Sequence, residues 1–65
     1  MNIAETIHHT DFSNARKAQI ARSHPDYVDE WVDGKYIKIA FSDDSFIAIR
    51  KVQVSSVDWG VRNAN

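Results

Sequence analysis

The sequence predicts an α+β domain in which an N-terminal helix packs on a small three- to four-stranded antiparallel β-meander. A run rich in good helix formers occupies residues 14–23 and stops just before the single proline of the chain. From residue 36 onward, apolar and polar side chains alternate with a period of two, which is typical of strands, and polar turn sequences separate the runs. The chain has 65 residues, which is enough for one domain.

The predicted helix runs from Asn14 to Ser23. Preceding Thr, Asp and Ser residues offer side-chain oxygens that can accept hydrogen bonds from the free N–H groups of the first turn. Pro25 lacks a backbone N–H and clashes with a preceding helical turn, so we expect the helix to end by His24. Small side chains recur every three residues and predict a narrow face suited to close packing on a sheet. These residues are Ala15, Ala18 and Ala21.

The segment from residue 25 to residue 33 is compatible with two structures. As a helix, it has proline at its first position and glycine just past its end. As a strand, it carries β-branched and aromatic residues that lead into Asp33-Gly34, a strong signal for a two-residue hairpin turn. We favour the hairpin, because the cross-strand pairs that it creates are of stabilising types. The expected pairs are Trp31 with Tyr36, Asp29 with Lys38, and Val28 with Ile39.

The remaining strands follow from alternation and turn chemistry. Residues 36–41 alternate, and after a polar turn residues 46–54 return as a strand that places Phe46 opposite Phe41. The β-branched apolar side chains of this second strand lie at odd positions in its first half and at even positions in its second half. This change indicates either that both faces of the strand are covered or that a bulge interrupts the strand. Residues 57–59 predict a short edge strand. The expected core consists of Ile20, Val28, Val32, Ile37, Ile39, Phe41, Phe46 and Val52.

Composition narrows the class of protein. The chain contains no cysteine, which excludes disulfides and thiolate metal sites, and its net charge of −1 argues against broad nonspecific nucleic-acid binding. Residues 1–10 carry neither the basic nor the apolar region of a secretory signal, and no apolar run approaches the ~20 residues that span a bilayer. We therefore expect a soluble, cytoplasmic protein with a single domain over residues 1–65 and flexible ends at residues 1–9 and 60–65.

The sequence shows no motif for catalysis or for cofactor binding. There is no G-x-S-x-G elbow, and the two glycines cannot build a phosphate-binding loop. Asp43-Asp44 is interpreted as a solvated hairpin tip rather than a catalytic carboxylate pair. Histidines raise a minor hypothesis of metal-dependent assembly, although neighbouring side chains point in different directions. They are His8, His9 and His24. We expect neither an enzyme nor a bound cofactor.

The pattern favours a noncatalytic protein-interaction module that docks on a larger protein or complex. Four acidic residues within residues 26–33 are interleaved with aromatic and β-branched side chains, and aromatic residues are enriched at interface hot spots. Small chains of this kind are typical accessory proteins of phages and plasmids, and inhibition of a host protein is one version of the hypothesis. A homodimer is compatible with it, since pairing would bury a sheet edge. The predicted contact residues are Tyr27, Asp29, Glu30, Trp31, Tyr36 and Trp59.

The alternative hypothesis is a small nucleic-acid-binding regulator. A sheet face that mixes aromatic and cationic side chains can stack the bases and neutralise the phosphates of a single strand. Binding of this kind weakens steeply with salt, because phosphate neutralisation releases counterions. The predicted contact residues are Arg16, Lys17, Lys38, Arg50 and Lys51.

Overall fold

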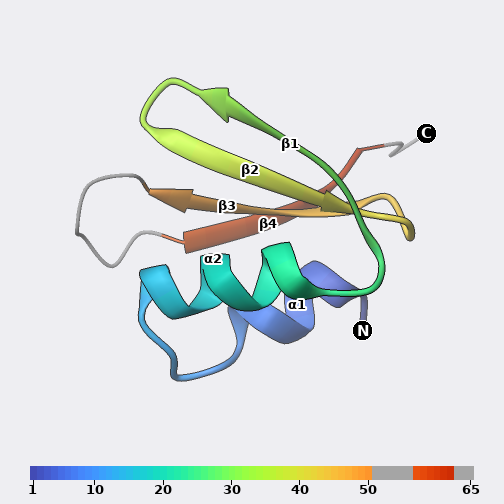
Figure 1. The fold of residues 1–65 in the computed structure, drawn as a ribbon, viewed down its shortest axis with the longest axis horizontal. Coiled ribbons are helices and arrows are strands. Elements are labelled where there is room, and N and C mark those ends of the chain that lie inside the picture. Colours follow the sequence, from blue (N-terminus) through green and yellow to red (C-terminus); the bar gives the residue numbers. More distant parts are fainter. Residues whose placement is uncertain (51–56, 63–65) are drawn as a thin grey trace.

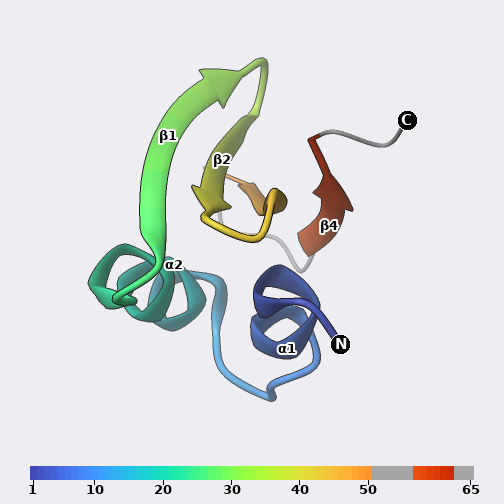
Figure 2. The same ribbon diagram turned by 90° about the vertical axis from the view of Figure 1, so that its right-hand side faces the viewer.

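The computed structural model describes residues 1–50 and 57–62 and has the predicted α+β architecture. The helices are α1 (Ile3–His8) and α2 (Asn14–Ser23), and the strands are β1 (Tyr27–Asp33), β2 (Tyr36–Phe41), β3 (Ser45–Arg50) and β4 (Val57–Val61). The strands form one antiparallel sheet in the order β1-β2-β3-β4. Both helices lie on the same side of this sheet (Figures 1 and 2).

The helix α1 replaces the flexible end that the sequence predicts for residues 1–9. The side chain of Asn2 caps it by accepting a hydrogen bond from the Glu5 N–H at 2.7 Å. Ala4 and Ile7 are buried, so the helix contributes to the core. A six-residue helix is unstable by itself, because helix nucleation is costly, and its formation therefore depends on tertiary contacts.

The helix α2 has the predicted bounds. The Oγ atom of Ser13 accepts a hydrogen bond from the Arg16 N–H at 3.2 Å and so acts as the N-cap, and the helix ends before His24. Of the predicted small-residue face, Ala21 is fully buried, Ala18 is half-buried and Ala15 is exposed. The proline and capping signals thus fix the length of this helix, as expected.

Residues 27–33 form the strand β1, so the favoured hairpin is confirmed, but its turn lies one residue later than predicted. Gly34 occupies the first turn position with φ +61°, a conformation that glycine adopts without steric cost. From Asp29 to Asp33 the register shifts by two residues, which keeps these side chains on their predicted faces, and an irregularity interrupts the pairing between Tyr27 and Asp29. The observed pairs include Trp31 with Lys38, Val32 with Ile37, and Asp29 with Ala40.

The β2–β3 register differs from the prediction by one residue, and this difference turns Phe46 to the other face. Ala40, rather than Phe41, lies opposite Phe46. Because side chains alternate with a period of two, a one-residue shift exchanges the two faces of a strand. Ile47 and Ile49 therefore face the helices and are buried, while Phe46 lies on the opposite side and is half-buried.

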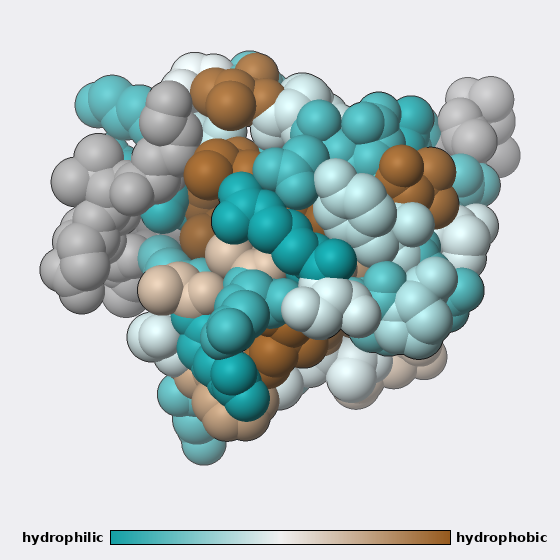
Figure 3. All heavy atoms as spheres, viewed as in Figure 1, coloured by the Kyte–Doolittle hydropathy of each residue, from teal (hydrophilic) through white to brown (hydrophobic). Residues whose placement is uncertain are grey.

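The core lies between the helices and the sheet. Its buried cluster consists of Ala4, Ile7, Ala21, Ile39, Phe41, Ile47 and Ile49, with Ile20, Ile37 and Trp59 packed against it. The prediction of Val28 and Val32 as core residues is wrong, since they are 56% and 61% exposed on the edge strand β1. Figure 3 shows hydrophobic surface in the region that Figure 1 assigns to this strand. The predicted core residue Val52 lies outside the described residues.

The C-terminal part of the described chain is a strand rather than a frayed end. β4 extends the predicted edge strand of residues 57–59 to Val61, and it pairs with β3 along its length. Residues 63–65 of the predicted flexible end lie outside the described residues. Neither α1 nor α2 has the length and hydropathy that a helix needs to cross a bilayer.

Candidate functional site

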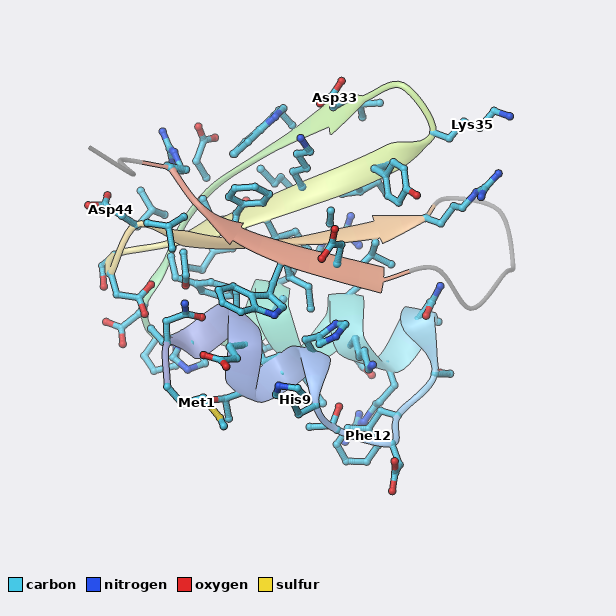
Figure 4. All side chains as sticks on the ribbon, turned by 180° about the vertical axis from the view of Figure 1, so that it is seen from behind. Met1, His9, Phe12, Asp33, Lys35 and Asp44 are labelled. Carbon is cyan, nitrogen blue, oxygen red and sulfur yellow. The ribbon has the colours of Figure 1, made fainter. Side chains whose placement is uncertain are left out.

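The sheet face turned away from the helices, here called the open face, collects the candidate binding residues. No element in residues 1–50 or 57–62 packs over it. Figure 4 shows Asp33 and Lys35 at the β1–β2 end of the sheet, far from Met1, His9 and Phe12 on the helical side. By strand register, the open face carries Asp29, Trp31 and Asp33 of β1, Tyr36, Lys38 and Ala40 of β2, Phe46, Ala48 and Arg50 of β3, and Asp58 and Gly60 of β4.

Aromatic rings and cations contact one another across the centre of the open face. The ring centroids of Trp31 and Phe46 lie 6.2 Å apart at an angle of 52°. The Nζ atom of Lys38 lies 5.2 Å from the Phe46 centroid, and the Arg62 guanidinium lies 5.2 Å from the Trp31 ring. Such cation–ring contacts are attractive because the ring face is electronegative. Lys38 also forms an ion pair with Asp33 at 2.8 Å.

Gly60 makes room for the ring of Phe46. The two residues pair across β3 and β4, and a Cβ atom added at Gly60 would lie 2.7 Å from Cζ of Phe46. Since real Cβ atoms do not approach a neighbour so closely, any side chain at this position would displace the ring. A glycine within a strand often indicates that another group approaches the backbone closely. Gly60 in the sequence could therefore have indicated such an approach.

A shallow hollow of about 580 Å³ lies at the hairpin end of the open face. Ala48 contributes only a methyl group where its neighbours on β2 and β4, Lys38 and Asp58, have long or charged side chains. Tyr36 and Arg50, which are directly paired across β2 and β3, also line the hollow. The result is a depression with an apolar floor and a charged rim.

The six predicted protein-contact residues are divided between two sides of the sheet. Asp29, Trp31 and Tyr36 lie on the open face. Trp59 lies opposite Ile47 and packs against the core on the helical side, so it is not adjacent to Trp31. The sequence analysis missed Phe46, which it placed in the core, and Arg62, which it placed in a flexible end.

Tyr27 and Glu30, the other two predicted contacts, join β1 to α2. Arg22 donates from Nε and Nη2 to the Glu30 carboxylate, both at 3.2 Å, and the Tyr27 hydroxyl donates to Glu30 Oε1 at 2.9 Å. The hydrogen bonds from Arg22 and then from Tyr27 hold the pKa of Glu30 below its usual range. The same bond to Glu30 raises the pKa of the Tyr27 hydroxyl. This arrangement links the edge strand to the helix.

The predicted nucleic-acid contacts are not brought together. Lys38 and Arg50 lie on the open face, whereas Arg16 is on α2, over the Phe12 ring at 5.7 Å. Lys17 is only 8% exposed, and its Nζ donates to the His8 carbonyl at 3.0 Å. A cation at a helix C-terminus satisfies free carbonyl groups there, so Lys17 has a structural contact instead of the predicted exposed one. Lys51 lies outside the described residues.

Both free edges of the sheet carry the same local feature. On β1, Asp29 Oδ1 accepts a hydrogen bond from the Glu30 N–H at 2.8 Å, and on β4, Asp58 Oδ1 accepts one from the Trp59 N–H, also at 2.8 Å. An unpaired N–H on an edge strand is a site at which another strand can add. Each aspartate occupies one such donor and adds negative charge beside it, which disfavours strand addition at both edges.

The histidines do not converge in the part of the chain that the structure describes. His8 and His9 pack edge to face with centroids 5.2 Å apart, while His24 packs on Phe41 and accepts the Asp26 N–H at 3.0 Å. Within residues 1–50 and 57–62, no three histidine or carboxylate side chains are placed to share a metal ion. Comparison with family models, curated proteins and solved structures finds no match to this chain. Its interpretation therefore rests on the open face.

Proposed function

We propose that the chain is a noncatalytic protein-binding module whose contact surface is the open face. The observation that carries this proposal is the contact between Trp31 and Phe46, two large rings on a sheet face that no described element covers. Both rings are half-buried, and an apolar patch with a polar rim on a folded domain commonly marks a binding surface. Tyr36, Arg50 and Arg62 lie on or beside the same face, and Trp, Tyr and Arg are the residues that dominate binding energy at protein interfaces.

The charges of the open face favour a protein partner over nucleic acid. Three carboxylates, those of Asp29, Asp33 and Asp58, lie among its cations. Carboxylates repel phosphates, and Lys38 is already paired with Asp33. Interspersed charges of both signs are well suited to a protein surface, which can offer complementary groups at each position.

The partner is expected to dock on the face of the sheet and not along its edges. Edge docking needs a row of free N–H and C=O groups, and Asp29 and Asp58 each occupy one N–H group on their strand. For the same reason, a homodimer formed by pairing two edges is disfavoured. The open face has no such protection and presents its side chains outward.

The test is capture of a partner from lysate of the source cells by tagged protein, with nuclease and at high salt. Trp31→Ala is expected to weaken recovery of a discrete protein about 30-fold, as for an interface hot spot. Phe12→Ala is the matched control, because Phe12 is an exposed ring with an arginine over it on the helical side. It should leave recovery unchanged.

Two results would contradict the proposal. Recovery that disappears on nuclease treatment or falls steeply with salt would support the nucleic-acid alternative instead. A captured protein whose recovery depends on Phe12 and not on Trp31 would move the contact surface to the helices. Circular dichroism of both variants establishes that each remains folded, so that lost recovery reports lost contact.

A further inference from the structure

Among the cations of the open face, Arg50 differs in having a solvent-shielded side-chain nitrogen without a hydrogen-bond partner among the described residues. Lys38 is paired with Asp33, and Arg62 lies over the Trp31 ring. The Nε atom of Arg50 is shielded from solvent and has no hydrogen-bond partner within residues 1–50 and 57–62. A shielded donor without an acceptor is unfavourable. A carboxylate that arrives from outside cannot reach the shielded Nε, but it can accept a bidentate bond from the two Nη groups of the planar guanidinium.

The surroundings of Arg50 fit an anion that is attached to an apolar group. Arg50 lies on the rim of the hollow of about 580 Å³, directly across from Tyr36 and near the small side chain of Ala48. Lys35 also lines the hollow and extends outward from the β1–β2 turn in Figure 4. Of the two carboxylates on the same rim, Asp33 is neutralised by Lys38, and Asp58 accepts the Trp59 N–H. Because a bond from a neutral N–H leaves the charge of Asp58 in place, the rim carries the positive charges of Arg50 and Lys35 against the single negative charge of Asp58.

We infer that this hollow is the receptor for an acidic segment of the protein partner, in which an Asp or Glu side chain binds Arg50 and a neighbouring apolar side chain contacts Ala48 and Tyr36. The inference rests on the proposed function and names the chemistry of the partner. A guanidinium matches a carboxylate through two parallel hydrogen bonds, and an apolar neighbour gains burial on the alanine floor. A nucleic acid would offer phosphates to the same cations, and it is distinguished from the acidic segment by the binding of oligothymidylate.

The probe is a short peptide of alternating Glu and Leu with blocked ends, so that only side-chain carboxylates are present. In NMR titrations of isotope-labelled protein, it should shift the guanidinium signals of Arg50 and the amide signals of Tyr36 and Ala48. The matched peptide of alternating Gln and Leu should not. Arg50→Gln is expected to weaken binding of the Glu peptide about tenfold, the effect of losing one charge-assisted contact. Arg50→Lys should also weaken it, because lysine lacks the planar fork.

The control variant is Arg16→Gln, which removes an exposed arginine on the helical side and should not change binding. Equal binding of the Gln peptide, equal loss in Arg16→Gln, or no shift with the Glu peptide would each overturn the inference. Tighter binding of oligothymidylate at the same signals would overturn it in favour of phosphate. Partner capture separates the two proposals: loss in Trp31→Ala but not in Arg50→Gln would retain the proposed function and remove the carboxylate receptor.

Discussion

Replacing Asp43 by alanine is expected to lower the free energy of unfolding by about 2 kcal/mol, because this carboxylate holds α1 against the sheet. Its Oδ2 atom accepts the Ile3 N–H at 2.9 Å, and Oδ1 accepts the Ser45 N–H at 3.0 Å and the Ser45 hydroxyl. The hydroxyl of Ser45 in turn accepts the buried Ala4 N–H at 3.2 Å. The variant leaves the Ile3 N–H in the first turn of a six-residue helix without its acceptor, and it removes the bond that orients the Ser45 hydroxyl toward Asp43.

The loss should depend on pH in a defined direction. Burial acts to raise the pKa of Asp43, but the bonds from the Ser45 hydroxyl and from the Ile3 and Ser45 N–H groups outweigh it and hold the pKa below its usual range. A carboxyl with a lowered pKa contributes stability above its unfolded pKa, which is about 3.9, and loses that contribution as the pH falls through its folded pKa. The difference between wild type and Asp43→Ala is therefore largest near neutral pH and shrinks below about pH 4.

Urea unfolding followed by tryptophan fluorescence measures both effects. Asp44→Asn is the control, because Asp44 is the neighbouring exposed aspartate and has φ 68°, a conformation that asparagine tolerates. It should change the free energy of unfolding by less than about 0.5 kcal/mol. Similar losses in the two variants, or a loss in Asp43→Ala that does not change with pH, would show that α1 is held by other contacts.

Removing the aspartates of both sheet edges is expected to make the protein associate with itself through those edges. The double variant Asp29→Ala and Asp58→Ala frees the N–H groups of Glu30 and Trp59 and removes one negative charge from each edge strand. The exposed side chains of Val28 and Val32 on β1 would then adjoin an edge that can pair. Sedimentation velocity over a range of protein concentrations should show larger species that wild type does not form.

A second pair of variants separates the hydrogen bond from the charge. Asp29→Asn with Asp58→Asn keeps an oxygen that can accept the N–H but loses the charge, so it should associate less than the alanine pair. Asp11→Asn with Asp44→Asn removes two charges away from the edges and should behave like wild type. If the alanine pair sediments as wild type does at every concentration, the aspartates do not protect the edges.

Local chemistry predicts α2 and the β1–β2 hairpin, and longer-range contacts decide the rest of the fold. Capping by Ser13 and termination before Pro25 are short-range effects, and the sequence shows them directly. The helix α1 depends on Asp43 and Ser45, which lie about forty positions away in the chain. Neither its composition nor its length distinguishes such a segment from a flexible end.

The candidate site was predicted only in part, because strand register decides which face a side chain occupies. Trp31 and Tyr36 reach the open face even though the predicted β1–β2 register is off by two residues, since an even shift preserves faces. The β2–β3 register is off by one, so Phe46, the ring that contacts Trp31, was assigned to the core. The turn at residues 42–44 is one residue shorter than predicted and sets this register through Asp44 at φ 68°, which alternation alone does not reveal.

The two tryptophans provide the most direct test that the open face is the contact surface, because they lie on opposite sides of the sheet. Protein labelled with 5-fluorotryptophan gives one fluorine NMR signal for Trp31 and one for Trp59, assigned with the Trp31→Phe variant. On addition of the captured partner, the Trp31 signal is expected to shift or broaden more than that of Trp59. A change confined to Trp59, or bound protein in which the Trp31 signal is unchanged, would contradict the assignment of the open face.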